Sequence, residues 1–339
     1  MPLFAVHLIA LSIAAAAASS TPFSSPPASG GSSFALSIVD PVLTPYTAAG
    51  DLNLTVVPAM AAAAAARDVD VLLLGGSNGE WPSLTTEERL SLLHAWAAAL
   101  GALGARAPRL LFHAGSTDVR TARVLAAAAE EAGAWAILLV SPGVVFRPLA
   151  AADGGVAATV ALLRDVAAAA PHTPMFYYHY PGIYNVDVSM AAFIPAARAA
   201  IPTFRGVKYI DSQFADLATA QAAAAGSGVD FFVQSGFLLP CLPLGCSGTP
   251  VFTWQGPFVR AISAAVAGGN ITAAAAAQTR MLALNAIIAA FNGTPAARAA
   301  YKHVFGIDLG PARPPLVDLT QAQDADLVAQ LVAGGFLPP

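Results

Sequence analysis

Eight short apolar runs alternate with alanine-rich stretches between residues 34 and 255, and this alternation constrains the fold more than any other feature. Strands that are apolar along their whole length and are separated by helices indicate a parallel sheet covered on both faces. We therefore interpret the runs as strands, at residues 35–39, 69–74, 109–114, 135–140, 175–179, 206–210, 230–234 and 250–253.

The stretches between the strands are rich in alanine, the strongest helix former. They predict helices at residues 53–66, 86–101, 118–132, 152–170, 189–200 and 214–225. The seventh connection, 236–244, contains two prolines and is not expected to form a long helix. Eight such units favour a (β/α)8 TIM barrel. The alternative is an open doubly wound sheet, which usually has a glycine-rich phosphate turn after its first strand, where this chain reads DPVLTPYTAAG.

The two ends of the chain differ from the barrel, which we place at residues 34–255. Residues 256–339 show no further strand pattern and predict a C-terminal helical extension, with helices at 256–268, 271–291, 295–304 and 320–334. Residues 1–33 combine a signal-like apolar segment with a linker rich in Ser, Pro and Gly. Because the segment lacks Lys and Arg, the secretory pathway, an organelle and the cytoplasm all stay open as locations.

Charge and apolar content limit the partners of the chain. Hydrophobic residues make up 56% of the sequence and charged residues 11%, but much of the apolar content is alanine. No run of about 18 strongly apolar residues follows the N-terminus, so we expect no membrane span. The formal net charge is −4 and no basic block occurs. We therefore expect no nucleic-acid partner.

No group of residues has the sequence spacing of a metal site. Cys241 and Cys246 are the two cysteines, too few for a disulfide framework or a zinc site, and we interpret them as unpaired core residues. We predict neither a metal nor another cofactor. A P-loop and the G-x-S-x-G motif of serine hydrolases are also absent from the sequence.

The first candidate catalytic residue is a lysine in the run FRGVKYI, residues 204–210, which contains the sixth expected strand. The chain has two lysines, Lys208 and Lys302, among 16 Lys and Arg residues. An apolar environment lowers the pKa of a lysine, and the neutral amine can form a Schiff base with a ketone, which a guanidinium cannot do. The alternative is that Lys208 extends to the strand end or pairs with Asp211.

The fifth expected strand ends in YYHY, the second candidate. Alternation places Tyr178 and Tyr180 on one face and Tyr177 and His179 on the other. A tyrosine beside a Schiff-base lysine could exchange protons, because its hydroxyl both donates and accepts. The alternative is that these aromatic residues only suit a strand. His179 is either a base or a packed histidine.

The loop GGSNGE, after the second expected strand, is the third candidate. Its glycines allow a tight turn with backbone N–H groups directed at a small anion, and Ser77 adds a hydroxyl donor. The loop therefore suits a carboxylate or a phosphate. We interpret Glu80 as a salt-bridge partner, and Thr85 with Glu88 as a capping box for the next helix.

These three motifs, in this order, resemble the N-acetylneuraminate lyase and dihydrodipicolinate synthase family of Schiff-base aldolases. GGSNGE resembles the family's pyruvate-carboxylate loop, MFYYHYPG its tyrosine strand, IPTFRGVKYIDS its lysine strand and GIDLGPARPPL its late proline-rich turn. The resemblance runs from about residue 36 to the C-terminus and is greatest to animal-type N-acetylneuraminate lyases. It implies a TIM barrel, a small-molecule substrate and a homotetramer.

The resemblance also implies roles for individual residues. Lys208 would form the Schiff base with pyruvate or a 2-oxo acid, and Tyr178 would relay protons. Ser77 and the backbone of Asn78 would bind the substrate carboxylate. The substrate-binding positions that contact the aldehyde half in the family correspond to Ile210, Val233, Ser235, Gly236 and Phe252.

One departure from the family pattern lies in the carboxylate loop, where Asn78 stands in place of a second hydroxyl residue and keeps only its backbone N–H. The other departures concern the aldehyde half. Where sialic-acid lyases have an Asp-Glu pair after the seventh strand, this chain has Ser235 and Gly236. The hydroxyl residue expected two positions after the lysine is Ile210, and a serine expected after the eighth strand is Phe252. The loss of these polar groups favours a smaller or more apolar aldehyde than a sugar.

Synthases of the family bind a second carboxylate through an arginine, and the matching residue here is Ile183. The synthases also have a tyrosine pair after the fourth strand, where this chain has Gly143 and Val144. We therefore expect a class I aldolase that cleaves a 2-oxo-4-hydroxy acid to pyruvate and an aldehyde. A synthase-like condensation of pyruvate with an aldehyde and a non-catalytic barrel that binds a 2-oxo acid are the alternatives.

Overall fold

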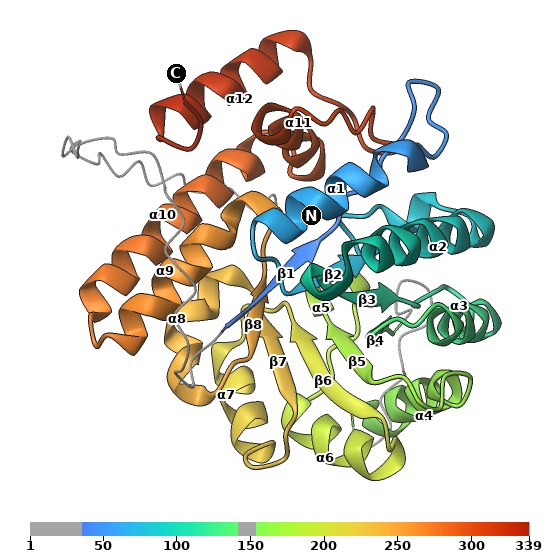
Figure 1. The fold of residues 1–339 in the computed structure, drawn as a ribbon. Coiled ribbons are helices and arrows are strands. Elements are labelled where there is room, and N and C mark those ends of the chain that lie inside the picture. Colours follow the sequence, from blue (N-terminus) through green and yellow to red (C-terminus); the bar gives the residue numbers. More distant parts are fainter. Residues whose placement is uncertain (1–35, 142–153, 339) are drawn as a thin grey trace, which may run out of the picture. The chain divides into compact units, whose positions relative to one another are not determined.

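The computed structural model describes residues 36–141 and 154–338, and the strands among them close into a parallel barrel (Figure 1). Each strand pairs with its neighbours in chain order, and β1 pairs with β8 to close the ring. The TIM-barrel prediction is thereby confirmed. The strands are β1 (Ser37–Pro41), β2 (Val71–Leu74), β3 (Arg109–His113), β4 (Ala136–Val140), β5 (Met175–His179), β6 (Phe204–Tyr209), β7 (Asp230–Val233) and β8 (Gly248–Pro250).

Helices alternate with the strands and surround the barrel (Figure 1). Between strands they are α1 (Val57–Ala66), α2 (Thr86–Leu103), α3 (Val119–Glu131), α4 (Val156–Ala167), α5 (Pro181–Tyr184), α6 (Met190–Ala200), α7 (Phe214–Ala223) and α8 (Leu238–Cys241). Short 3-10 helices are η1 (Leu54–Val56), η2 (Trp81–Ser83), η3 (Gly104–Arg106), η4 (Ser235–Phe237), η5 (Leu242–Leu244) and η6 (Thr253–Gln255). After the barrel come α9 (Gly256–Ala267), α10 (Ile271–Ala290), α11 (Thr294–Phe305) and α12 (Gln321–Ala333).

The eighth strand lies earlier than predicted, at Gly248–Pro250 instead of 250–253, whereas the other strands agree with the prediction to within two residues at each end. Gly248 lies directly against Ser37 of β1, and a Cβ at Gly248 would overlap the Ser37 carbonyl oxygen. A Gly-Thr-Pro strand carries no apolar pattern, so hydropathy placed the eighth strand two to three residues too late. The prediction also missed α5, which has only four residues.

Several predictions fall outside the described residues. These are the signal-like segment with its linker, the start of the fourth predicted helix, and positions Gly143 and Val144. The two cysteines are described: Cys241 is buried, Cys246 is partly buried, and both are free, as predicted.

Alternation along the strands divides the buried side chains into two clusters. An outer cluster between strands and helices includes Tyr177, Val207 and Tyr209, and an inner cluster fills the barrel with residues such as Phe176 and Tyr178. Gly206 on β6 allows the inner packing, because a Cβ there would overlap the Phe176 ring and the Asp230 carbonyl oxygen. Successive residues of β5 and β6 therefore face opposite sides of the barrel wall.

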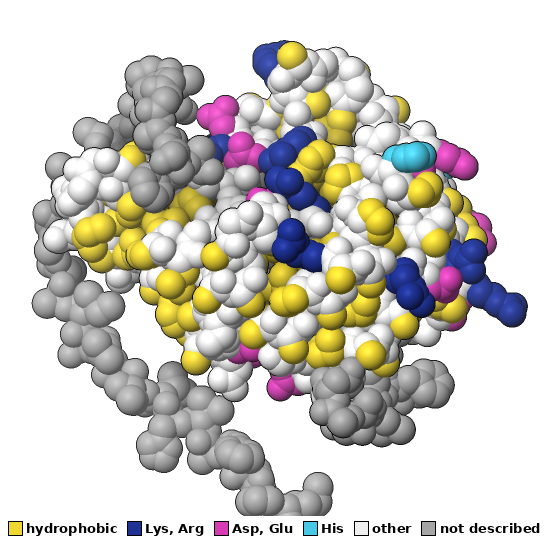
Figure 2. All heavy atoms as spheres, turned by 90° about the horizontal axis from the view of Figure 1, so that it is seen from below, with side chains coloured by type: hydrophobic (Ala, Val, Ile, Leu, Met, Phe, Trp, Pro, Cys, Tyr) yellow, Lys and Arg dark blue, Asp and Glu magenta, His cyan; other side chains and the backbone are white. Residues whose placement is uncertain are grey.

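Helix α10 (orange in Figure 1) is an apolar element on the outside of the barrel. Among the described residues it is the one helix long and apolar enough to cross a membrane. Its apolar content is mostly alanine, and it packs against α9 and α12. On the face shown in Figure 2, apolar, basic and acidic side chains are scattered among other surface atoms.

A buried arginine joins the C-terminal helices to the barrel. Arg298 on α11 is 4% exposed, and its guanidinium donates to the carbonyls of Thr44 and Gly310 and to Glu80 Oε1, the last at 3.1 Å. Glu80 also accepts from the backbone N–H of Arg313 at 3.0 Å. Burial raises the pKa of Glu80, and the Arg313 hydrogen bond and the Arg298 charge act against this. The predicted salt-bridge role of Glu80 is confirmed.

Replacing this arginine tests the connection. Arg298→Met leaves the buried Glu80 carboxylate without its ion-pair partner, so we expect a loss of about 3–5 kcal/mol in the free energy of unfolding. Urea denaturation followed by tryptophan fluorescence measures it. The matched control is Arg123→Met, which removes an exposed pair with Asp165 at 3.5 Å and is expected to cost about 1 kcal/mol or less. Equal losses for the two variants would contradict the account.

Candidate active site

Lys208 lies inside the barrel on β6, directly opposite Tyr178 on β5. Its side chain is buried at 4% exposure, and its Nζ is 3.7 Å from the centroid of the Tyr178 ring. Burial lowers the pKa of Lys208 to about 7. A large share of the amine is therefore neutral near physiological pH, as a nucleophile requires. The alternative pairing with Asp211 is not observed, because Asp211 faces His179 instead.

A chain of hydroxyl groups leads away from Tyr178. The Ser77 Oγ lies 3.3 Å from the Tyr178 Oη and 3.0 Å from the Tyr184 Oη. Trp81 Nε1 donates to the Tyr184 Oη at 3.0 Å. Because an indole can only donate, Tyr184 can donate to Ser77 and Ser77 to Tyr178, which leaves the Tyr178 proton free for another acceptor. Burial raises the pKa of Tyr178, so it remains protonated.

The loop after β2 takes its shape from its glycines. Gly75 has φ +71, and a Cβ at Gly79 would lie 3.0 Å from the Val42 carbonyl oxygen. Ser77 is thereby turned toward the tyrosines, as its hydrogen bonds show. The Asn78 side chain points elsewhere and accepts from Thr294 Oγ1 at 3.3 Å, so only its backbone is available to a ligand in the barrel.

The helix after this loop begins as predicted. Thr85 and Glu88 form a reciprocal capping box at the start of α2. Arg313 also forms an ion pair with Glu88, which joins the late proline-rich turn to the start of this helix. The prediction that these residues have a structural role is confirmed.

Sequence reasoning missed four residues of this site: Trp81, His113 and Tyr184, and Arg89, whose guanidinium lies over the Trp81 ring. His113 is fully buried beside Trp81 and Tyr178, with ring centroids 5.4 and 6.3 Å away. Burial, followed by the charges of Arg89 and Lys208, holds the pKa of His113 well below its usual range. Its imidazole is therefore neutral. The short helix α5 folds Tyr184 back over the site, and the PGIY turn was the signal that could have revealed it.

The predicted positions for the aldehyde half do not all face the same space. Ile210 packs against the inner cluster, whereas Val233 is fully buried in the outer cluster and faces the helices. Ser235 Oγ accepts from Asn285 on α10 at 2.9 Å, and Phe252 stacks on Trp254. No atom would lie within 4 Å of a Cβ at Gly236. Of these five, Ile210 alone joins the cluster that contains Tyr178.

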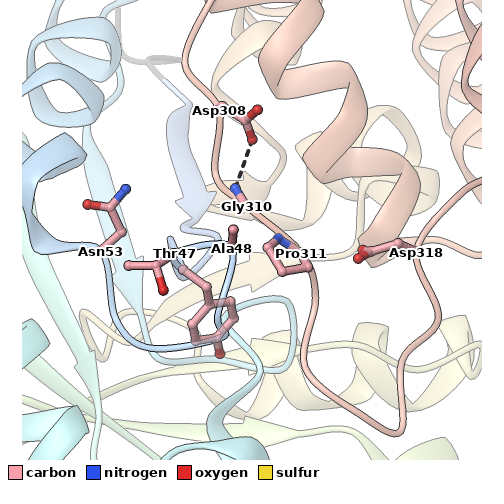
Figure 3. A pocket seen from close by; sticks show the side chains of 8 residues that line it. Thr47, Ala48, Asn53, Asp308, Gly310, Pro311 and Asp318 are labelled. Carbon is pink, nitrogen blue, oxygen red and sulfur yellow. Dashed lines mark hydrogen bonds between the residues drawn. The ribbon is translucent and has the colours of Figure 1, made fainter. Parts of the chain in front are cut away.

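A surface pocket of about 470 Å³ lies between the loop after β1 and the connection from α11 to α12 (Figure 3). It shares no lining residue with the Lys208 cluster. Its two acidic residues already have partners: Asp308 pairs with Lys302 and accepts from the Gly310 N–H, and Asp318 accepts from the Ala312 N–H. The pocket is therefore separate from the Lys208 site.

Comparison with protein families matches residues 35–333, which include the whole barrel and its C-terminal helices, to the Dihydrodipicolinate synthetase family. The chain belongs to this family. N-acetylneuraminate lyase from Danio rerio is 30% identical over 308 residues, covering 87% of this chain and 94% of the relative. The 4-hydroxy-tetrahydrodipicolinate synthase from Kineococcus radiotolerans is 30% identical over 307 residues, covering 89% and 94%.

Solved structures of the family share the fold. N-acetylneuraminate lyase from Proteus mirabilis superimposes with a TM-score of 0.80 at 24% identity, covering 89% of this chain and 99% of that one. Family membership and the named relatives make this chain an enzyme, a carbon–carbon lyase of the aldolase type. The relatives include both lyases and synthases, so the membership does not distinguish between these two activities.

The two lysines permit a direct test of the pKa of Lys208. Trace acetylation with acetic anhydride between pH 5 and about 11, quantified peptide by peptide, reports the neutral fraction of each amine. We expect labelling of Lys208 to rise through pH 7, because its pKa is lowered to about 7. Lys302 is the internal control, since its hydrogen bond with Asp308 raises its pKa. If both lysines became labelled only above about pH 9, the account of Lys208 would be wrong.

Proposed function

We propose that this family member is an N-acetylneuraminate lyase-like class I aldolase, which cleaves a 2-oxo-4-hydroxy acid to pyruvate and an aldehyde through a Schiff base on Lys208. The observation that carries the proposal is the buried amine of Lys208, whose pKa is lowered to about 7 and which lies against Tyr178. Burial of a lysine without an ion pair lowers the stability of the fold. A lysine with only a structural role would therefore not be expected at this position.

The reaction begins at the ketone. The neutral Lys208 amine attacks C2 of the substrate, and loss of the C2 oxygen as water gives an iminium. The C3–C4 bond then breaks: the C4 hydroxyl loses its proton and becomes the aldehyde, and the electron pair of the bond moves into the iminium to give an enamine. A proton added at C3 gives the pyruvate imine, and water hydrolyses it to pyruvate and the free amine.

Tyr178 is the residue proposed to carry protons in these steps. Because its pKa is raised, the Tyr178 hydroxyl is protonated before the reaction. It is proposed to accept one proton as it donates its own, without forming a free phenolate. Ser77 and Tyr184 extend the path by two further hydroxyls. The Ser77 hydroxyl and the Asn78 backbone are proposed to hold the substrate carboxylate beside it. Neutral His113, which meets the Tyr178 ring edge to face, adds no positive charge that would destabilise the iminium.

The proposed aldehyde is smaller or less hydroxylated than a sugar. Ile210 presents an apolar side chain beside the inner cluster where the family pattern has a hydroxyl. Each hydroxyl of a sugar buried without a partner would cost about 1–3 kcal/mol. The family's homotetramer is proposed for this chain as well, on the resemblance alone.

A synthase-like condensation of pyruvate with an aldehyde is the second candidate. The observation that favours it is the 30% identity to the Kineococcus synthase, equal to that of the Danio lyase. Against it, the position of the synthases' carboxylate-binding arginine is Ile183, which is apolar and 49% exposed.

Pyruvate release from a panel of 2-oxo-4-hydroxy acids with apolar and hydroxylated tails tests the proposal. We expect turnover that Lys208→Arg abolishes, because a guanidinium forms no Schiff base. Tyr178→Phe should lower kcat about 10²–10⁴-fold, since it removes the proton carrier. A coupled lactate dehydrogenase assay measures each rate. Absence of pyruvate release from every compound would favour the non-catalytic barrel.

The proposed preference for an apolar aldehyde can be tested separately. Ile210→Ser restores a hydroxyl beside Lys208, so we expect the ratio of kcat/KM for hydroxylated over apolar substrates to rise about tenfold. Ile271→Ser on the exposed side of α10 is the matched control and should leave the ratio unchanged. An unchanged ratio in Ile210→Ser would show that this position does not contact the aldehyde.

A further inference from the structure

A second group of polar side chains lies on the outer side of the barrel wall, behind the strand ends that carry Tyr178 and Lys208. His179 and Tyr209 are the next residues along β5 and β6, so alternation turns them outward, and their rings stack 5.0 Å apart. His179 has no exposed surface, and neither of its ring nitrogens has a hydrogen-bond partner among the described residues. A buried imidazole without partners requires an explanation.

Carboxylates face this histidine from two directions. Ligand atoms of His179, Asp187 and Asp211 all lie within 4.8 Å of one another. His179 Nε2 is 3.7 Å from Asp211 Oδ2, too far for a hydrogen bond. Asp187 comes from the segment between α5 and α6 and is exposed, whereas Asp211 follows β6 and is partly buried. The fold thus brings together three groups that are distant in the sequence.

The charges of this group are not balanced by the protein. Asp216 accepts from the Tyr209 hydroxyl at 3.3 Å. Within residues 36–141 and 154–338, Asp187, Asp211 and Asp216 form no ion pair with Lys or Arg. Negative charge therefore gathers around a buried imidazole whose ring nitrogens have no hydrogen-bond partner among the described residues, and such an environment attracts a cation.

We propose that His179, Asp187 and Asp211 bind a zinc ion, with water as the fourth ligand. One imidazole nitrogen with two carboxylates suits zinc, whereas magnesium and calcium favour oxygen ligands alone. Zinc–ligand bonds of about 2.0–2.2 Å place neighbouring atoms of a tetrahedron about 3.3 Å apart, close to the 3.7 Å between His179 and Asp211. The exposed Asp187 gives the ion a path from solvent.

The proposed zinc ion departs from the sequence-based expectation that the chain binds no metal. That prediction rested on spacing along the sequence, and residues 179, 187 and 211 show no such spacing. A bound ion would join the segment before α6 to the loop after β6, and so hold the ends of β5 and β6 together. Backbone pairing already links these ends, because Ile210 N–H donates to the His179 carbonyl at 2.8 Å. The proposal does not depend on the proposed reaction.

Metal titration of the full chain, without a histidine tag and after dialysis against EDTA, tests the site. Isothermal titration calorimetry with Zn²⁺ should show one ion per chain, and thermal denaturation should show a higher Tm when zinc is present. Co²⁺ should give the visible absorption of a tetrahedral nitrogen and oxygen site. Asp187→Asn, at an exposed position where folding is not at risk, should weaken Zn²⁺ binding at least tenfold and remove the cobalt absorption.

The control variant is Asp326→Asn, which removes an exposed aspartate on α12, and it should bind zinc as the unaltered chain does. Absence of zinc binding in the unaltered chain would overturn the proposal. So would zinc binding of equal affinity and stoichiometry in Asp187→Asn, because the ion would then lie elsewhere.

Discussion

The pairing of β5 with β6 is the contact on which the rest of the site depends. It sets Lys208 opposite Tyr178, and barrel closure removes both side chains from water. Loss of hydration alone lowers the pKa of Lys208, because burial is the cause and no carboxylate pairs with it among the described residues. A shift of one residue in this pairing would turn Lys208 toward the helices and end the contact.

Side chains alternate along β5 and β6, so the outer side of the barrel wall carries different residues from the inner side. Inside, hydroxyls and neutral imidazole surround an amine; outside, carboxylates surround His179. The C-terminal helices also contact this region, because Arg298 on α11 forms an ion pair with Glu80, which lies in the same glycine-rich loop as Ser77. The extension therefore supports the shape of the loop that faces Lys208, although it supplies no residue to the Lys208–Tyr178–Ser77–Tyr184 group.

Sequence reasoning succeeded where one signal was enough. Continuous apolar runs revealed seven strands, and the scarcity of lysine pointed to Lys208. It failed where the relevant contact was tertiary or the pattern was absent. The Gly-Thr-Pro strand β8 has no apolar repeat, Tyr184 reaches the site only through a one-turn helix, and the His179 group is assembled from three separate segments. Val233, named for its place in a motif, faces the outer cluster because that is its side of β7.

Trapping of the Schiff base tests the central claim most directly. The full chain is incubated with pyruvate, reduced with sodium borohydride, digested and analysed by mass spectrometry to locate the modified residue. The account predicts an adduct on Lys208, with Lys302, the other lysine of the chain, unmodified. An adduct on Lys302 alone, or no adduct under conditions in which the protein remains folded, would contradict it.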